Sequence, residues 1–229
     1  PSSGIPLSCL PISTGKVEFI STSIRDADLN GVHIECGDYI GFVGKEMMVS
    51  LKDKVAAAKE LLEKMGTVDV EENFIGTRWS KLLINASFSG MSAVLGCTFG
   101  EAAADKASRR IVQALIKECI DVCHAGGIRI EPVQGKDIVK LLNYSNAAKK
   151  AFSYFIIPIA IRKHAKLKAS MLQDLEKGKL TEVDAINGAV SAYGRKVGCP
   201  TPMNDRVVEI IHKIEQGQLK PGVENLRLF

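Results

Sequence analysis

The pattern that most limits the fold of this 229-residue chain is a helical periodicity that begins at Asn73 and continues almost to the C-terminus. Apolar residues recur there at every third or fourth position, which is typical of amphipathic helices. Breaks or kinks are expected where prolines and glycines interrupt the pattern, as at Pro132, Pro158, Gly178 and Gly198. The predicted helices cover about residues 74–95, 104–125, 135–150, 152–175, 182–197 and 203–216. Six helices with short connections indicate an all-α domain over residues 73–229.

Residues 1–72 show a different pattern, with short runs of β-branched and aromatic residues. Such runs predict strands at Val17–Thr22, Val32–Cys36 and Tyr39–Val43. They are followed by a predicted helix, Leu51–Met65, and a further strand, Thr67–Val70. A strand, a helix and a strand in this order form an α/β fragment.

The α/β fragment has no glycine-rich loop of the form G-x-G-x-x-G, which normally opens a dinucleotide-binding domain. Gly41–Gly44 and Gly96–Gly100 have other spacings and other surroundings. Strands this close to Pro1 would have unpaired edges if nothing preceded them. We therefore expect residues 1–72 to be the later part of a larger α/β domain.

The charge and the apolar runs limit the classes of partner. A net charge of +4 is too small to indicate nucleic acid, and the basic cluster Arg162–Lys168 lacks interleaved aromatic residues, so a solvated helix face explains it better. No apolar run approaches the roughly 20 residues of a membrane span, and no signal peptide is recognisable. Six scattered cysteines are typical of a reducing compartment. We expect a soluble, cytoplasmic protein with no nucleic-acid and no membrane partner.

One group of residues has metal-ligand character, namely Cys119, Cys123 and His124. These residues lie inside a helical pattern, and no second ligand cluster is near them in the sequence. Thiols that pack as small hydrophobic groups are the better interpretation, so no metal is predicted.

A polar stripe crosses the first predicted helix. Lys81, Asn85 and Ser89 stand four residues apart, so they share one helical face, while Leu82, Leu83, Ile84 and Phe88 make the rest of the helix apolar. Polar groups on so apolar a helix need partners. The stripe is therefore either a solvated face or the lining of a pocket in which Lys81 can transfer a proton.

A second polar constellation runs from Ser170 to Gly188. Thr181 followed by Asp184 is similar to a capping box, which predicts a helix start at Thr181 with Glu182 and Asp184 near the positive end of the helix dipole. In the alternative interpretation, Glu182 points into a cleft beside Lys81 and holds its ammonium group charged. Spacing alone leaves both interpretations open.

These blocks together resemble a known family. Trp79-Ser80-Lys81-Leu82 with Asn85, Ser170-Met171-Leu172-Gln173-Asp174 with Thr181–Gly188, and Gly198–Asn204 are similar, in this order, to signature blocks of the ketopantoate reductases (2-dehydropantoate 2-reductases). The resemblance runs from about Gly15 to Ile214. It implies that residues 1–72 are the end of a Rossmann-type domain. Residues 73–229 would then form a C-terminal helical domain similar to that of 6-phosphogluconate dehydrogenase.

The resemblance also implies an activity, the NADPH-dependent reduction of ketopantoate or a related branched 2-oxo acid, as in pantothenate biosynthesis. Lys81 matches the general acid, and Asn85 and Ser170 match substrate-binding positions. Glu182 matches the residue that contacts the cofactor, NADP(H), at the nicotinamide ribose. The expected partners are a small 2-oxo acid and a second copy of the chain.

Three departures from the family pattern limit this implication. Ser89 stands at a substrate-side position where a second asparagine is common, and Phe99 stands where another asparagine often precedes Gly100-Glu101. The glycine-rich first half of the cofactor domain has no counterpart in the 229 residues. The alternative function is a truncated, non-catalytic helical module for dimerisation or binding.

Overall fold

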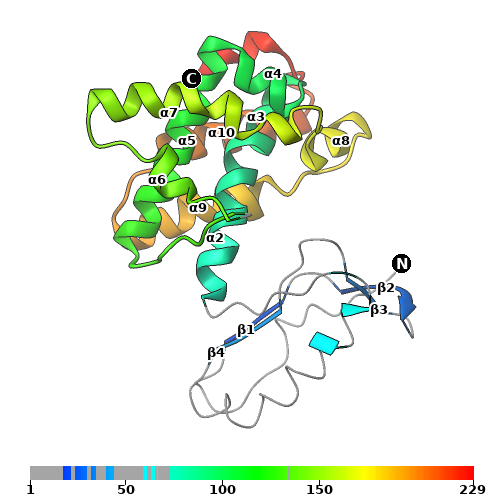
Figure 1. Cartoon of the computed structure of the whole chain (residues 1–229). Helices are drawn as coiled ribbons and strands as arrows, with labels where there is room; N and C mark the ends of the chain where they lie inside the picture. The colour runs from blue at the N-terminus through cyan, green and yellow to red at the C-terminus, as the bar shows by residue number, and fades with distance from the viewer. Residues whose placement is uncertain are drawn as a thin grey trace. The chain divides into compact units, whose positions relative to one another are not determined.

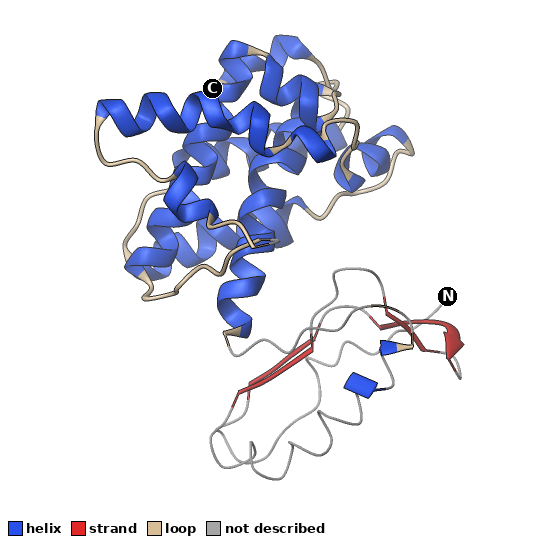
Figure 2. Ribbon diagram, viewed as in Figure 1, coloured by secondary structure: helices blue, strands red, loops and turns tan. Residues whose placement is uncertain are grey.

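The computed structural model describes residues 18–21, 24–29, 32–34, 40–43, 59–60, 63–64, 66, 73–133 and 135–229. The chain divides into two compact units, Pro1–Phe74 and Ile75–Phe229 (Figure 1). The first unit contains the described strands and the second is helical, as the colours of Figure 2 show.

The described strands of the first unit form two antiparallel pairs. β1 (Glu18–Ser21) pairs with β4 (Ile40–Val43), and β2 (Ile24–Leu29) pairs with β3 (Val32–Ile34). Strands are thus found at the three positions predicted within residues 17–43, and β2 lies where no strand is predicted, since aspartates such as Asp26 and Asp28 are poor strand formers. Among the described strands there is no parallel pair, so they do not show a Rossmann-type sheet.

Two further elements predicted for the first unit lie largely outside the described residues. Lys59, Glu60 and Glu63, all within the predicted helix Leu51–Met65, are helical, and the rest of that helix is outside the described part. The predicted strand Thr67–Val70 lies wholly outside it.

The second unit confirms the predicted helical domain. Its helical elements are α2 (Phe74–Ile84), the π-helix η2 (Asn85–Ser89), α3 (Gly90–Leu95), α4 (Phe99–Ala104), α5 (Lys106–Ala125), α6 (Ile138–Leu142), α7 (Ala147–Ala160), the 3₁₀ turn η3 (Arg162–His164), α8 (Ser170–Glu176), α9 (Val183–Val197), α10 (Pro202–Glu215) and η4 (Val223–Leu228). No helix among the described residues is long and apolar enough to cross a membrane.

Helix α5 supplies much of the core of this unit. It contacts α4, α6, α7, α9, α10 and η2, and Val112, Leu115 and Ile120 on it are fully buried. Asp105 caps its N-terminus by accepting hydrogen bonds from the backbone N–H groups of Ala107 and Ser108. Burial of one apolar face against several neighbours accounts for this helix.

Two of the predicted helices have the wrong boundaries. The segment 135–150 contains only α6 and the start of α7, because Asn146 accepts from the N–H of Lys149 and caps a new helix. The segment 152–175 is divided into the rest of α7, η3 and α8. Pro158 lies near the end of α7, which continues for two more residues to Ala160.

Candidate active site

The predicted polar stripe lies on one continuous helical run made of α2, η2 and α3. Lys81 is in the last turn of α2 and Asn85 opens the π-helix, and both residues are half-buried. Ser89 closes the π-helix and is 6% exposed. The Ser89 end of the stripe is therefore not a solvated face.

The π-helix changes the spacing on which the stripe was predicted. The Gly90 N–H donates to the Asn85 carbonyl, five residues back, where an α-helix would use the Ala86 carbonyl. A π turn holds more residues than an α turn, so it rotates each residue less. The step from Asn85 to Ser89 therefore does not add the drift of about 40° that the α-helical step from Lys81 to Asn85 adds.

A buried asparagine supports this π turn from the far end of the sequence. Asn187 Nδ2 on α9 donates to the Ala86 carbonyl at 2.9 Å and to Asn204 Oδ1 at 3.0 Å. Sequence reasoning missed Asn187 and Asn204 as parts of the site. The available signal was an amide at Asn187, next to the apolar Ile186 of a predicted helix.

The second constellation lies on two elements that contact the π-helix. Ser170 is the exposed first residue of α8, and Glu182 is the exposed residue just before α9. Both α8 and α9 pack against η2, and the Ala169 N–H also donates to Ser92 Oγ on α3 at 3.3 Å. The fold thus joins the elements that carry Ser170 and Glu182 to the helical run of Asn85 and Ser89.

The predicted capping box at Thr181 is wrong. Glu182 is the N-cap of α9 and makes no side-chain cap hydrogen bond, while Thr181 Oγ1 accepts from the Val183 N–H at 3.2 Å. The Asp184 carboxylate instead lies 3.1 Å from His212 Nε2 on α10. Asp184 prefers this cross-helix partner because α9 and α10 pack together.

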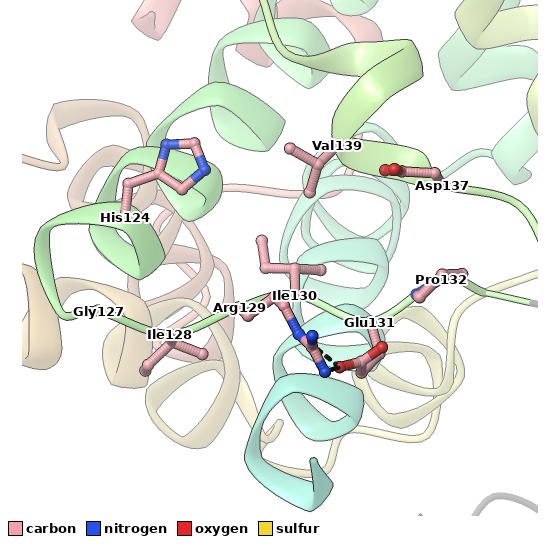
Figure 3. A pocket seen from close by; sticks show the side chains of 9 residues that line it. All are labelled: His124, Gly127, Ile128, Arg129, Ile130, Glu131, Pro132, Asp137 and Val139. Atoms are coloured by element: carbon pink, nitrogen blue, oxygen red, sulfur yellow. Dashed lines mark hydrogen bonds and ion pairs between the residues drawn. The ribbon is translucent and has the colours of Figure 1, made fainter. Parts of the chain in front are cut away.

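A separate hollow of about 680 Å³ lies along the segment after α5 (Figure 3). His124, Asp137 and Val139 line it together with the loop Gly127–Pro132, in which Arg129 and Glu131 form an ion pair at 2.8 Å. The same loop is joined to α2, because Ser80 Oγ donates to the Glu131 carbonyl at 2.5 Å. Its charged groups are paired with each other, and the sequence predicts no site residue here.

The buried cysteines behave as packing groups. Burial raises the pKa of the Cys123 thiol to about 12 and that of Cys119 well above its ordinary value. Protonated thiols are poor metal ligands. Within residues 73–133 and 135–229, no group of three or more His, Cys, Asp or Glu side chains is placed to hold a metal ion.

Comparison with known proteins identifies the helical unit. The profile of the family described as "Ketopantoate reductase PanE/ApbA C terminal" matches residues 73–215, more than half of the chain. A second profile, that of the C-terminal region of fatty acid kinase-like proteins, matches residues 12–86, about a third of it.

Individual relatives agree with the first profile. A 2-dehydropantoate 2-reductase of Streptococcus pyogenes serotype M6 is 29% identical over 146 residues, which are 63% of this chain and 42% of that protein. The structure of a ketopantoate reductase from Ralstonia eutropha JMP134 has a TM-score of 0.60 at 22% identity, over 88% of this chain and 60% of its own. The complex of D-mandelate dehydrogenase with NADH has a TM-score of 0.59 at 23% identity, over 87% and 71%.

The structural likenesses, at these identities, show a shared fold. The chain spans 42% of the length of the curated relative from S. pyogenes, and the matched part is helical from residue 73 onward. The chain therefore belongs to the ketopantoate reductase family and contains its C-terminal helical domain.

Proposed function

We propose that the protein reduces ketopantoate, or a related branched 2-oxo acid, with NADPH as the hydride donor and Lys81 as the proton donor. The observation that carries this proposal is the position of Lys81, half-buried in the last turn of α2 and just before the π-helix that begins at Asn85. Family membership supports it, since matched relatives are named 2-dehydropantoate 2-reductases.

The chemistry fits an ammonium group at this place. Hydride addition to the carbonyl carbon of a 2-oxo acid leaves negative charge on the carbonyl oxygen. The Lys81 ammonium stabilises that charge and donates the proton that completes the 2-hydroxy acid. Half-burial strengthens both effects, because the ammonium group interacts more strongly with a nearby anion where water is partly excluded.

Other polar residues then have distinct roles. The Asn85 amide, the Ser89 hydroxyl and the Ser170 hydroxyl bind the substrate, with Ser89 offering a shorter group than the asparagine common in the family. Glu182 is exposed and its carboxylate does not cap α9, so it is suited to accept hydrogen bonds from ribose hydroxyls of the cofactor. NADP(H) would supply the hydride, and residues 1–72 would be the later part of its Rossmann-type domain.

The test of this function is the Lys81→Met substitution in the full-length protein. We expect kcat for ketopantoate to fall by about 10²- to 10⁴-fold, the usual contribution of a positioned general acid, while NADPH affinity changes little. Lys163→Met, on the exposed turn η3, is the control and should leave kcat unchanged. Wild-type turnover in Lys81→Met would refute the role of Lys81.

A second candidate function, a module that pairs with another copy, is favoured by one surface. Phe152, Phe155 and Ile159 are exposed on α7 and stand three and four residues apart, so they form one apolar face, here named the α7 face. One structural neighbour is described as a dimeric ketopantoate reductase from Staphylococcus aureus. Pairing through the α7 face is compatible with the reductase function as well.

A further inference from the structure

The π turn beside the proposed proton donor leaves one backbone carbonyl without its helical partner. Because the Gly90 N–H donates to Asn85, the Ala86 carbonyl does not receive it. Ala86 is fully buried, so water does not easily replace the lost donor. Asn187 Nδ2 fills this place at 2.9 Å, across 101 residues of sequence.

The orientation of the Asn187 amide is set by a chain of hydrogen bonds that begins at a carboxylate. Glu118 on α5 accepts from the backbone N–H of Asn204 at 3.0 Å and from Asn204 Nδ2 at 2.7 Å. Asn204 Oδ1 must therefore face Asn187, whose amide nitrogen donates to it at 3.0 Å. The second hydrogen of the same amide nitrogen is then directed at the Ala86 carbonyl.

Close packing leaves this amide little freedom. Asn187 and Asn204 are both 0% exposed. A Cβ atom at Gly90 would lie 3.0 Å from Asn187 Oδ1 and 3.0 Å from Val207 Cγ1, which explains the glycine at the start of α3. Turning the amide over would place its oxygen against two other oxygens and lose both hydrogen bonds.

We propose that Asn187 is a positioning residue: by donating to the Ala86 carbonyl, it holds the π turn that fixes where Asn85 and Ser89 stand relative to Lys81. The role of the turn in turnover rests on the proposed reductase function. Asn187 itself acts through backbone geometry and does not act on the substrate. Glu118 and Asn204 orient Asn187 and so belong to the same support.

The test compares Asn187→Ala with Ser191→Ala, both made in the full-length protein. Ser191 is one turn further along α9, is also buried, and bonds Thr201 Oγ1 at 3.3 Å, away from the π-helix. In Asn187→Ala we expect kcat for ketopantoate to fall at least tenfold, with the KM for NADPH within twofold of wild type. Ser191→Ala should keep both constants. Asn187→Ser, which retains a hydroxyl too short to reach Ala86, is expected to behave as Asn187→Ala does and serves if the alanine variant does not fold.

A second readout is independent of activity. The backbone N–H of Gly90 should exchange with solvent at least tenfold faster in Asn187→Ala than in Ser191→Ala, because the π turn loses its support. An active enzyme whose kcat survives Asn187→Ala and Asn187→Ser overturns the positioning role, whatever the exchange rates are. A wild type that does not reduce ketopantoate refutes the proposed function instead. In that case the exchange of Gly90 alone decides whether Asn187 holds the turn.

Discussion

Single thiols in the helical unit are kept protonated by their surroundings. Burial, helped by the nearby Glu101 carboxylate, raises the pKa of the Cys97 thiol to about 11, although the side chain is only half-buried. A thiol of this pKa carries about 100-fold less thiolate at pH 8 than one at the ordinary value of 9.0. Cys97 is therefore accessible in part but chemically inert.

The Cys97 prediction is tested by alkylation with iodoacetamide, followed peptide by peptide by mass spectrometry between pH 7 and 9. In the native chain Cys97 should react about 100-fold more slowly than in the urea-unfolded chain, because only the thiolate reacts. Its rate should rise with pH over the whole interval, without a plateau, since the raised pKa lies above it. Equal rates in native and unfolded chains would contradict the raised pKa.

Residue patterns predicted the stripe of the candidate site but not its support. Lys81, Asn85 and Ser89 are four apart, so local periodicity was sufficient to place them on one helical run. The contact of Asn187 with the Ala86 carbonyl joins residues 101 positions apart. No local pattern encodes such a contact, because it depends on how α9 packs against η2.

At the scale of elements, the sequence was most informative where a strong local signal ends a helix. α9 ends at Gly198, which adopts the left-handed conformation with φ 70°, and the predicted segment 182–197 differs from α9 by one residue. The π-helix was not predictable, because its extra residue is supported by a distant amide. The boundary at Asn146 was missed, although an asparagine before a helical run is a common N-cap.

Gly90 provides an element-scale prediction about the packing of α3 against α9 and α10. Alanine in place of a helical glycine usually stabilises a protein by about 1 kcal/mol. At Gly90 the added methyl would lie 3.0 Å from Asn187 Oδ1 and from Val207 Cγ1, so we expect a net loss of about 1–3 kcal/mol. Urea denaturation of Gly90→Ala measures the free energy of unfolding.

The matched control for Gly90→Ala is Gly188→Ala on α9. A Cβ at Gly188 would lie 3.6 Å from Asp184 and from the Val183 carbonyl, an ordinary contact, so this variant should gain about 0.5–1 kcal/mol. If both variants gained stability, the close approach at Gly90 would not limit the packing.

At the scale of the whole molecule, the family profile and the division of the chain coincide closely. The profile begins at residue 73, and the second compact unit begins at Ile75. The predicted boundary between 1–72 and 73–229 rested on the same change from alternating to helical periodicity. The helical unit was thus predictable as a unit, whereas the pairing of strands in the first unit depends on contacts that periodicity does not specify.

The α7 face leads to a prediction about assembly. Phe155 is 68% exposed in the middle of this face, and burial of a large aromatic side chain there would stabilise a pair of chains by about 1.5–3 kcal/mol. We therefore expect sedimentation velocity to show a dimer for the wild type and a weaker association, by about tenfold or more in the dissociation constant, for Phe155→Ser. Leu180→Ser is the control, because Leu180 is 79% exposed in the loop between α8 and α9 and lies outside the α7 face. A monomeric wild type, or equal weakening by both variants, would show that chains do not pair through α7.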